Sequence, residues 1–239
     1  PLRHSFIDDC ETPVAAFLKL RGETPQSPAF LLESAEQGQR VGRWSFIGVR
    51  PREVIRWSLG DAGDPYAIAA DAVARVSQAQ LPDLPPFAGG AVGFFGYDLV
   101  RTVETTLGAP NPDTLGLPDM ALMLSDVLVV FDHLKHTLSV IAHVETDGDV
   151  ERSYADAVAT IANMERADFE GMVARIVEYC HAGDTFQVVP SQRWTGAIDG
   201  IDPFSIYRGL RVVNPSPYMY FLDFLDFQIA GASPEPLLT

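Results

Sequence analysis

The run MALMLSDVLVVF, residues 120–131, is followed closely by a second apolar run, TLSVIAHV, residues 137–144. Both have the composition of β-strands. The segment between them, Asp132–His136, is mostly polar and is predicted to be the loop of a hairpin. A pair of adjacent strands joined in this way places antiparallel pairing at the centre of the predicted fold.

Other parts of the first half also resemble strands, because apolar and polar residues alternate between turn signals. Tyr66–Val76 differs, since its apolar side chains recur at helical spacing. The predicted strands are Ala29–Ser34, Arg43–Val49, Val54–Leu59 and the stretch AVGFF after Gly89-Gly90.

The second half mixes helices with strands. Pro203 at a first helical position and Asn214-Pro215 after the last one mark the ends of one predicted helix. The predicted elements are a helix over 151–180, a strand over 185–194, a helix from 202 to about 213, and a hairpin over 218–224 and 227–230. Together with the first half, these elements predict an α+β fold built on large antiparallel sheets packed with helices.

Composition excludes several classes of function. The formal net charge is −15 and the pI is about 4.6, so a nucleic acid would be repelled. The two cysteines, Cys10 and Cys180, form neither a metal-binding spacing nor a disulfide framework. The apolar run at Val127–Phe131 is too short to span a membrane, and no signal segment opens the chain. We therefore expect a cytoplasmic protein.

Six motifs stand out along the chain. They are LLES (31–34), GRWSFIG (42–48), GGAVGFFGYDLVR (89–101), AGDTFQVVPSQRW (182–194), NPSPYMYFLDF (214–224) and GASPE (231–235). Their order and spacing are similar to those of anthranilate synthase component I, the large subunit in the chorismate-binding enzyme family. The resemblance covers essentially the whole chain and implies the chorismate-utilising enzyme fold, here truncated.

The resemblance implies an activity and partners. Members of the family convert chorismate and ammonia to 2-amino-2-deoxyisochorismate, which loses pyruvate to give anthranilate. A glutamine amidotransferase subunit supplies the ammonia, so a hetero-oligomer is expected, and Tyr97, Asp98 and Arg101 are candidates to face that subunit. Mg²⁺ binds the substrate. Its ligands are expected beyond Thr239, so we predict no metal site in this chain and no activity of the chain alone.

The resemblance also divides the chain into two regions. Residues 1–150 correspond to the N-terminal region, which is mostly strands and is involved in regulation and partner binding. Residues 151–239 correspond to the start of the catalytic domain, which is incomplete here. Leu225 stands at a turn position where the family usually has glycine, so we expect strain in that hairpin.

Gln187 is the candidate residue on the side of the nucleophile. Relatives that add water to chorismate have a lysine at this position, which acts as a general base. Ammonia is already nucleophilic when neutral and needs no such base, so glutamine favours ammonia over water. This disfavours an isochorismate or salicylate synthase. The alternative is that Gln187 is a polar strand residue facing solvent.

Glu235 matches the family's general acid. The hydroxyl that leaves the ring needs a proton donor, and a carboxylic acid whose pKa is raised by burial can supply the proton. Pro234 would fix the adjacent backbone. The alternative is a surface glutamate in a Ser-Pro-Glu turn.

The segments LLES and NPSPYM imply a feedback site for L-tryptophan, because in the family they meet across the domain. Glu33 could neutralise the ammonium of the ligand, and the Ser34 hydroxyl could bind either polar group. Pro217 and Met219 would offer apolar contacts. The predicted tryptophan-binding residues are Glu33, Ser34, Asn214, Pro215, Pro217, Tyr218 and Met219.

Two other functions stay open. Aminodeoxychorismate synthase component I has the same fold and first substrate but retains the pyruvyl group, and the tryptophan motifs favour anthranilate synthase over it. A non-catalytic tryptophan-sensing module is a hypothesis of a different class, because the chain contains both halves of the expected regulatory pocket.

Overall fold

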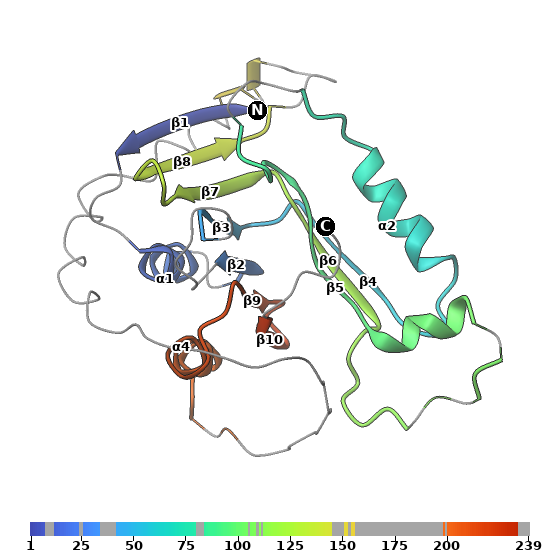
Figure 1. Cartoon of the computed structure of the whole chain (residues 1–239). Coiled ribbons are helices and arrows are strands. Elements are labelled where there is room, and N and C mark those ends of the chain that lie inside the picture. Colours follow the sequence, from blue (N-terminus) through green and yellow to red (C-terminus); the bar gives the residue numbers. More distant parts are fainter. Residues whose placement is uncertain are drawn as a thin grey trace.

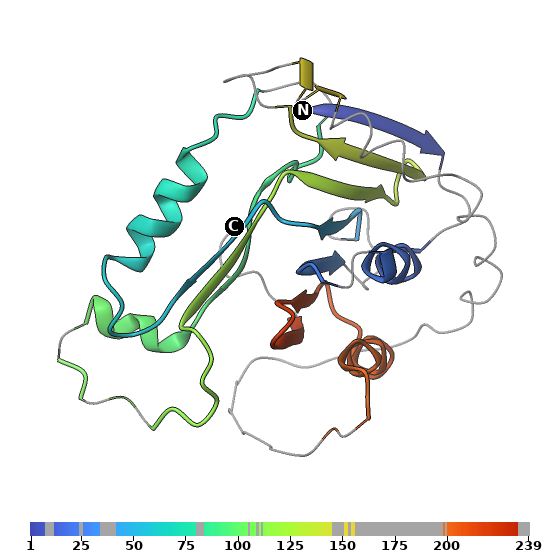
Figure 2. The same cartoon turned by 180° about the vertical axis from the view of Figure 1, so that it is seen from behind.

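The computed structural model describes residues 1–7, 12–23, 26–33, 42–79, 84–104, 106–108, 110, 112–144, 151–152, 154–155, 198 and 200–233. In these ranges the chain forms two antiparallel sheets packed with helices, which confirms the predicted α+β fold (Figures 1 and 2). The helices are α1 (Pro13–Glu23), α2 (Pro65–Ala74), the 3-10 helix η1 (Tyr97–Thr102) and α4 (Pro203–Val213).

The larger sheet has seven strands in the order β1-β8-β7-β3-β2-β9-β10, and all neighbouring strands are antiparallel. The predicted hairpin loop joins β7 to β8, where Asp132 is opposite Thr137. The strands of this sheet are β1 (Leu2–Ile7), β2 (Ala29–Glu33), β3 (Trp44–Val49), β7 (Val127–Asp132), β8 (Thr137–Ala142), β9 (Tyr218–Asp223) and β10 (Gln228–Ser233).

The smaller sheet has the order β4-β6-β5, formed by β4 (Glu53–Trp57), β5 (Gly90–Phe95) and β6 (Met120–Ser125). The run 120–131, predicted as one strand, is therefore two strands in different sheets. The chain bends at Asp126, whose carboxylate accepts a 2.6 Å hydrogen bond from Arg52. Apolar residues continue on both sides of the bend because both strands are buried, so the pattern does not reveal it.

The elements form four layers (Figures 1 and 2). Helices α1 and α4 cover one face of the larger sheet, where Phe204 and Phe221 pack edge to face with their ring centroids 5.0 Å apart. The smaller sheet covers the other face, and Phe94 meets Phe224 between the sheets. Helix α2 packs on the far side of the smaller sheet, over Trp57. An apolar core therefore lies between each pair of adjacent layers.

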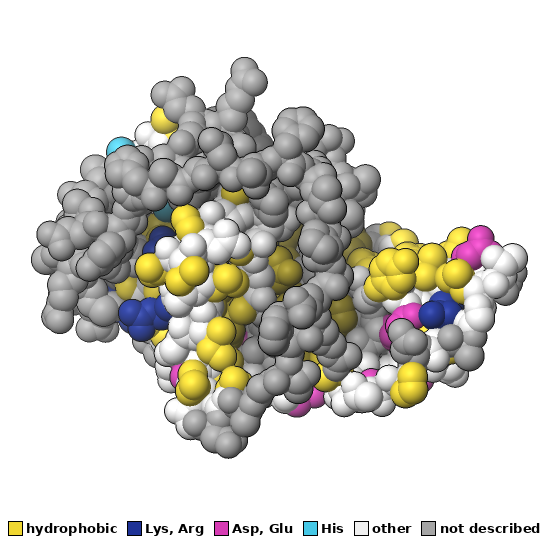
Figure 3. All heavy atoms as spheres, turned by 60° about the horizontal axis from the view of Figure 1, so that its bottom comes forward, with side chains coloured by type: hydrophobic (Ala, Val, Ile, Leu, Met, Phe, Trp, Pro, Cys, Tyr) yellow, Lys and Arg dark blue, Asp and Glu magenta, His cyan; other side chains and the backbone are white. Residues whose placement is uncertain are grey.

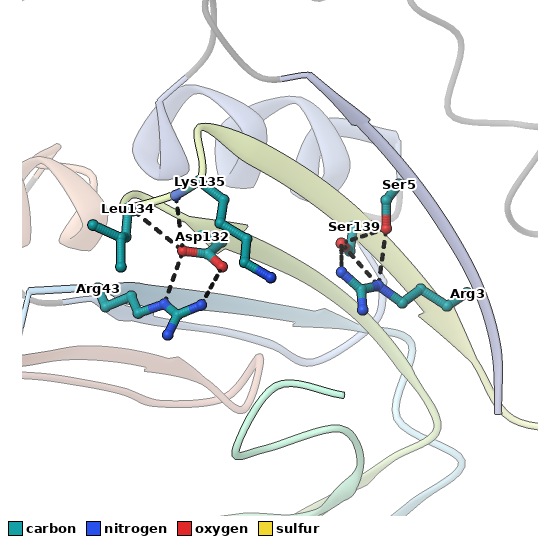
Figure 4. A network of polar contacts seen from close by, with 7 residues as sticks. All are labelled: Arg3, Ser5, Arg43, Asp132, Leu134, Lys135 and Ser139. Atoms are coloured by element: carbon teal, nitrogen blue, oxygen red, sulfur yellow. Dashed lines mark hydrogen bonds and ion pairs between the residues drawn. The ribbon is translucent and has the colours of Figure 1, made fainter. Parts of the chain in front are cut away.

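The sequence patterns do not predict β1 or α1. Strand β1 lies at the edge of the larger sheet, where polar residues are tolerated, and Arg3 and Ser5 both bond to Ser139 of β8 (Figure 4). Helix α1 has a local signal, because Thr12 precedes Pro13 and its hydroxyl accepts a hydrogen bond from the backbone N–H of Ala15.

The helix and hairpin predicted near the end of the chain are confirmed as α4, β9 and β10. Helix α4 begins at Pro203, but the Asp202 side chain makes no capping hydrogen bond and lies 3.7 Å from Arg21 of α1 instead. Strand β9 lies between β2 and β10. Elements from both sides of the predicted division at residue 150 therefore share one sheet.

Leu225 lies in the turn between β9 and β10 with a φ of 77°, in the left-handed region where glycine is usual. Its backbone N–H donates to Asp223 Oδ1 at 2.9 Å, and the Gln228 amide donates to the same oxygen. The turn is thus held by the carboxylate of Asp223 despite the unfavourable φ.

Candidate functional site

The two segments of the expected regulatory site lie side by side. Strand β2 pairs with β9, and Glu33, the last residue of β2, is directly opposite Met219. Helix α4 ends at Val213, and residues 214–217 connect it to β9. The structure therefore brings Glu33 together with the start of β9, although the two segments are far apart in the sequence.

The carboxylate of Glu33 is buried in a polar cluster with two residues of α4, and its side chain is only 1% exposed. Tyr207 donates a 2.6 Å hydrogen bond to Glu33 Oε1. The Nε of Arg211 lies 2.8 Å from the same oxygen as an ion pair, but its N–H is not aligned for a hydrogen bond with any acceptor in the described part of the chain. Tyr207 and Arg211 are four residues apart and so lie on the same face of α4.

The surroundings of Tyr207 determine the protonation state of its phenol. Burial raises the pKa of Tyr207 far above its ordinary value, the negative charge of Glu33 and the hydrogen bond to it raise that pKa further, and Arg211 lowers it. The phenol is therefore protonated and is the donor in its hydrogen bond to Glu33. Because an unpaired buried carboxylate is costly, the cluster needs both partners.

A second ion pair supports the same side of the sheet. Arg21 of α1 places its Nε 2.7 Å from Asp223 Oδ2, at the end of β9, and its guanidinium lies over the Phe221 ring at 5.8 Å from the centroid. Asp223 is buried. This ion pair therefore links α1 to β9, and the hydrogen bond from Tyr207 to Glu33 links α4 to β2 in a similar way.

The predicted tryptophan-binding residues fall on different faces of the larger sheet, because successive side chains of a strand point in opposite directions. Glu33 and Met219 face the helices, and Met219 is fully buried in that core. Tyr218 shares the opposite face with Tyr220, toward the smaller sheet. Asn214 and Pro215 are exposed, whereas Pro217 is half-buried.

An open apolar groove of about 460 Å³ lies on the face toward the smaller sheet. Leu32 comes from the first predicted segment, and Tyr220 and Leu222 come from the strand that begins in the second. A groove of this volume is large enough for an indole ring. The lining residues are Leu32, Phe87, Ala91, Val92, Gly93, Phe94, Tyr220, Leu222 and Ile229.

Sequence reasoning does not identify three residues of this region. Ser216 is buried between two prolines, and its hydroxyl donates to the backbone carbonyl of Ser233 on β10. Tyr207 and Arg211 could be found from their i,i+4 spacing on the predicted helix, but the pattern does not show that they face a carboxylate. The groove residues of β5 could not be assigned, because the pairing of the two sheets is not visible in the sequence.

Several predicted residues, Ser34, Gln187 and Glu235, lie outside the described residues. In the described part of the chain, no group of three or more His, Cys, Asp or Glu side chains is placed to hold a metal ion. No helix among the described residues is long and apolar enough to cross a membrane.

The three residues suggested for partner contact lie on η1. Tyr97 is 91% exposed, and Arg101 forms a 2.6 Å ion pair with Asp98. Val103, just after η1, is also exposed. Hydrophobic side chains reach the surface at several places on the face of the molecule shown in Figure 3.

Comparisons with known proteins agree with this architecture. A crystal structure of anthranilate synthase component I from Streptococcus pneumoniae matches 96% of this chain and 57% of that chain, with a TM-score of 0.55 and 25% sequence identity. The fold is thus that of a chorismate-utilising enzyme.

The sequence comparisons define the family. The profile of the chorismate binding enzyme family matches residues 27–239, so the chain belongs to that family. Anthranilate synthase component 1 from Pseudomonas putida is 38% identical over 283 residues, and that from Thermus thermophilus is 38% identical over 266 residues. Each match covers 100% of this chain but 56% of the relative, so the chain spans about half the length of these relatives.

Proposed function

We propose that the chain is part of the large subunit of an anthranilate synthase, which converts chorismate and ammonia to anthranilate and pyruvate. The observation that carries the proposal is the match over the whole chain to proteins named anthranilate synthase component 1, at 35–38% identity in three of them. The pairing of β2 with β9 supports it, because Leu31–Glu33 of the first motif and Tyr218 and Met219 of the second lie in those strands.

In this proposal two residues act on the reacting ring. Gln187 orients neutral ammonia for its addition without stabilising a competing hydroxide, and Glu235 donates a proton to the hydroxyl that leaves. Glu235 follows Ser233, the last residue of β10, by two positions. Mg²⁺ remains the expected cation, but no described residues fit it, so we assign it no step.

The reaction can be tested with the protein that carries this chain, supplied with chorismate, Mg²⁺ and ammonium chloride. Anthranilate is fluorescent, and the proposal expects equal amounts of anthranilate and pyruvate. An amino product that keeps its enolpyruvyl group would instead identify an aminodeoxychorismate synthase. Formation of a hydroxylated product from water would contradict the role given to Gln187.

We also propose a hetero-oligomer with a glutamine amidotransferase subunit, docked over η1. Tyr97 is an exposed aromatic residue beside an ion pair, a combination that is common at protein interfaces. Tyr97→Glu should weaken association with the amidotransferase and lower the rate with glutamine, but should leave the rate with ammonium chloride unchanged. Tyr154→Glu, which changes another exposed tyrosine, is the control. Equal rates with glutamine for both variants would place the interface elsewhere.

Feedback inhibition by L-tryptophan is the third part of the proposal. The groove between the sheets accommodates the indole, since Leu32 and Tyr220 are opposite each other in the pairing of β2 with β9 and both line the groove. Ser34 follows Glu33 in the sequence, and its hydroxyl is proposed to bind one of the polar groups of the ligand. Calorimetry on the 239-residue chain should detect tryptophan binding that is lost in Ser34→Ala. If the folded chain binds no tryptophan, the proposed feedback site is wrong.

A further inference from the structure

The connection between α4 and β9 is fixed at both of its ends through one residue, Glu33. At one end, Glu33 is bound by Tyr207 and Arg211 of α4. At the other end, the backbone of Glu33 is paired with Met219 of β9. Residues 214–217 join the last residue of α4 to the first residue of β9. Together with the two contacts of Glu33, they form a closed loop of interactions.

Residues of the connection itself make further contacts. The Asn214 backbone N–H donates to the Leu210 carbonyl at 2.8 Å and ends the helix. The Ser216 hydroxyl donates to the Ser233 carbonyl of β10. The connection is therefore attached to three elements, which are α4, β9 and β10.

Burial argues against direct contact between Glu33 and a ligand. Its side chain is 1% exposed and faces the helices, whereas the groove is on the other face of the sheet. Arg211 is 31% exposed and already supplies a positive charge to Glu33. A ligand ammonium could reach this carboxylate only if the guanidinium moved away.

We propose that Tyr207 and Arg211 are positioning residues, which hold the Glu33 carboxylate so that residues 214–217 keep the conformation that an amino-acid effector binds. The inference rests on the proposed tryptophan site and gives Glu33 a different role there, because Glu33 acts through α4 and not on the ammonium. The effector is an aromatic amino acid in the groove, with its polar groups toward the connection.

Hydrogen exchange tests the positioning role without any ligand. Tyr207→Phe removes only the hydroxyl that donates to Glu33, and Tyr66→Phe removes a hydroxyl from exposed Tyr66 of α2 as a matched control. In the 239-residue chain, amide exchange in peptides that cover residues 208–219 should be at least ten times faster in Tyr207→Phe, with no change in the control. Unchanged exchange in a folded Tyr207→Phe chain would overturn the inference.

Calorimetry with L-tryptophan tests the link to the effector. Tyr207→Phe and Arg211→Gln should each weaken tryptophan binding at least ten-fold, while Arg208→Gln, which changes an exposed arginine of the same helix, should not. Faster exchange with unaltered tryptophan affinity would overturn the effector part. If the unaltered chain binds no tryptophan, the proposed regulatory site fails, and hydrogen exchange still decides whether Tyr207 and Arg211 fix the connection.

A comparison of two ligands separates this role from direct contact. Indole-3-propionate lacks the ammonium of tryptophan. If Glu33 binds the ammonium, Glu33→Gln weakens tryptophan but not indole-3-propionate. The positioning role predicts instead that Tyr207→Phe lowers the affinity for both ligands by the same factor. A loss restricted to tryptophan in Tyr207→Phe would contradict it.

Discussion

The two faces of the larger sheet near β2 and β9 differ sharply. On the helix side, Glu33 and Met219 are buried, and the carboxylate is held by groups of α4. On the side of the smaller sheet, Leu32 and Tyr220 line an open groove. Because neighbouring residues of one strand supply both faces, a single motif contributes to a closed core and to a cavity.

This difference suggests that the two faces of the larger sheet have different roles. The helix side has close aromatic packing and ion pairs that involve α1 and α4. The groove is open, and none of the described residues that line it is charged. We infer that binding occurs on the groove side, and that the helix side determines the geometry of the strands that form the groove.

The largest effect is expected from the helix side. Phe221 is 0% exposed and packs against the rings of Phe17, Phe204 and Tyr207. Phe221→Ala should lower the free energy of unfolding by about 3–5 kcal/mol, because it leaves a cavity in a close-packed core. Urea denaturation measures this, with Ile229→Ala on the half-open groove side as the comparison. An equal loss in both variants would mean that the two faces do not differ in packing.

Filling the groove should impair binding more than stability. Ile229 is half-buried and lines the groove, so Ile229→Trp puts a ring where the indole is proposed to lie. Tryptophan affinity should fall at least ten-fold, about 1.4 kcal/mol, while the free energy of unfolding changes less. The control, Ile201→Trp, changes an exposed residue before α4. Normal affinity in Ile229→Trp would place the ligand on the helix side.

Most strands could be predicted from the sequence, because alternation and turn signals are local. The paired segments 120–131 and 137–144 correctly indicated an antiparallel hairpin, and Pro203 correctly marked the start of α4. The bend at Asp126 could not be predicted. It depends on which sheet each half of the run joins, and that is decided by contacts with distant strands.

The candidate site could be predicted only in part. Motif resemblance pointed to Glu33 and Met219, which the structure places opposite each other. It did not show that the Glu33 carboxylate is already bound by Tyr207 and Arg211, since these are separated from it by more than 170 residues and only packing brings them together. The roles of Gln187 and Glu235 stay predictions.

A second buried carboxylate in the same sheet, Asp132, is held by a different set of partners from Glu33. At the β7–β8 hairpin, Arg43 donates two hydrogen bonds to Asp132, at 3.0 and 2.8 Å (Figure 4). Burial raises the pKa of Asp132, but these bonds and those from the Leu134 and Lys135 backbones outweigh burial, so the pKa lies below its ordinary value of 3.8. The pair therefore stabilises the fold above that value, and the stability is lost as the pH falls through the lower, folded-state pKa.

Asp132→Asn should thus lower the free energy of unfolding by about 1 kcal/mol at pH 7, and the difference from the unaltered chain should shrink below pH 4. Urea denaturation between pH 3 and pH 7 measures this. Asp71→Asn, which removes an exposed carboxylate of α2, serves as the control. A constant difference across this range would show that the charge of Asp132 is not the stabilising feature.

The smallest effect concerns the turn that joins β9 to β10, which both line the groove. Leu225 is 44% exposed, so replacing it removes little packing, and its φ of 77° costs about 1–2 kcal/mol for a residue with a Cβ. Glycine removes this cost but adds freedom to the unfolded chain, about 0.5–1 kcal/mol. Leu225→Gly should therefore stabilise the chain by about 0.5–1 kcal/mol in thermal or urea unfolding. Leu107→Gly changes an exposed leucine without a positive φ and should give no gain. A loss of stability in Leu225→Gly would mean that the leucine side chain contributes more by its contacts than its backbone conformation costs.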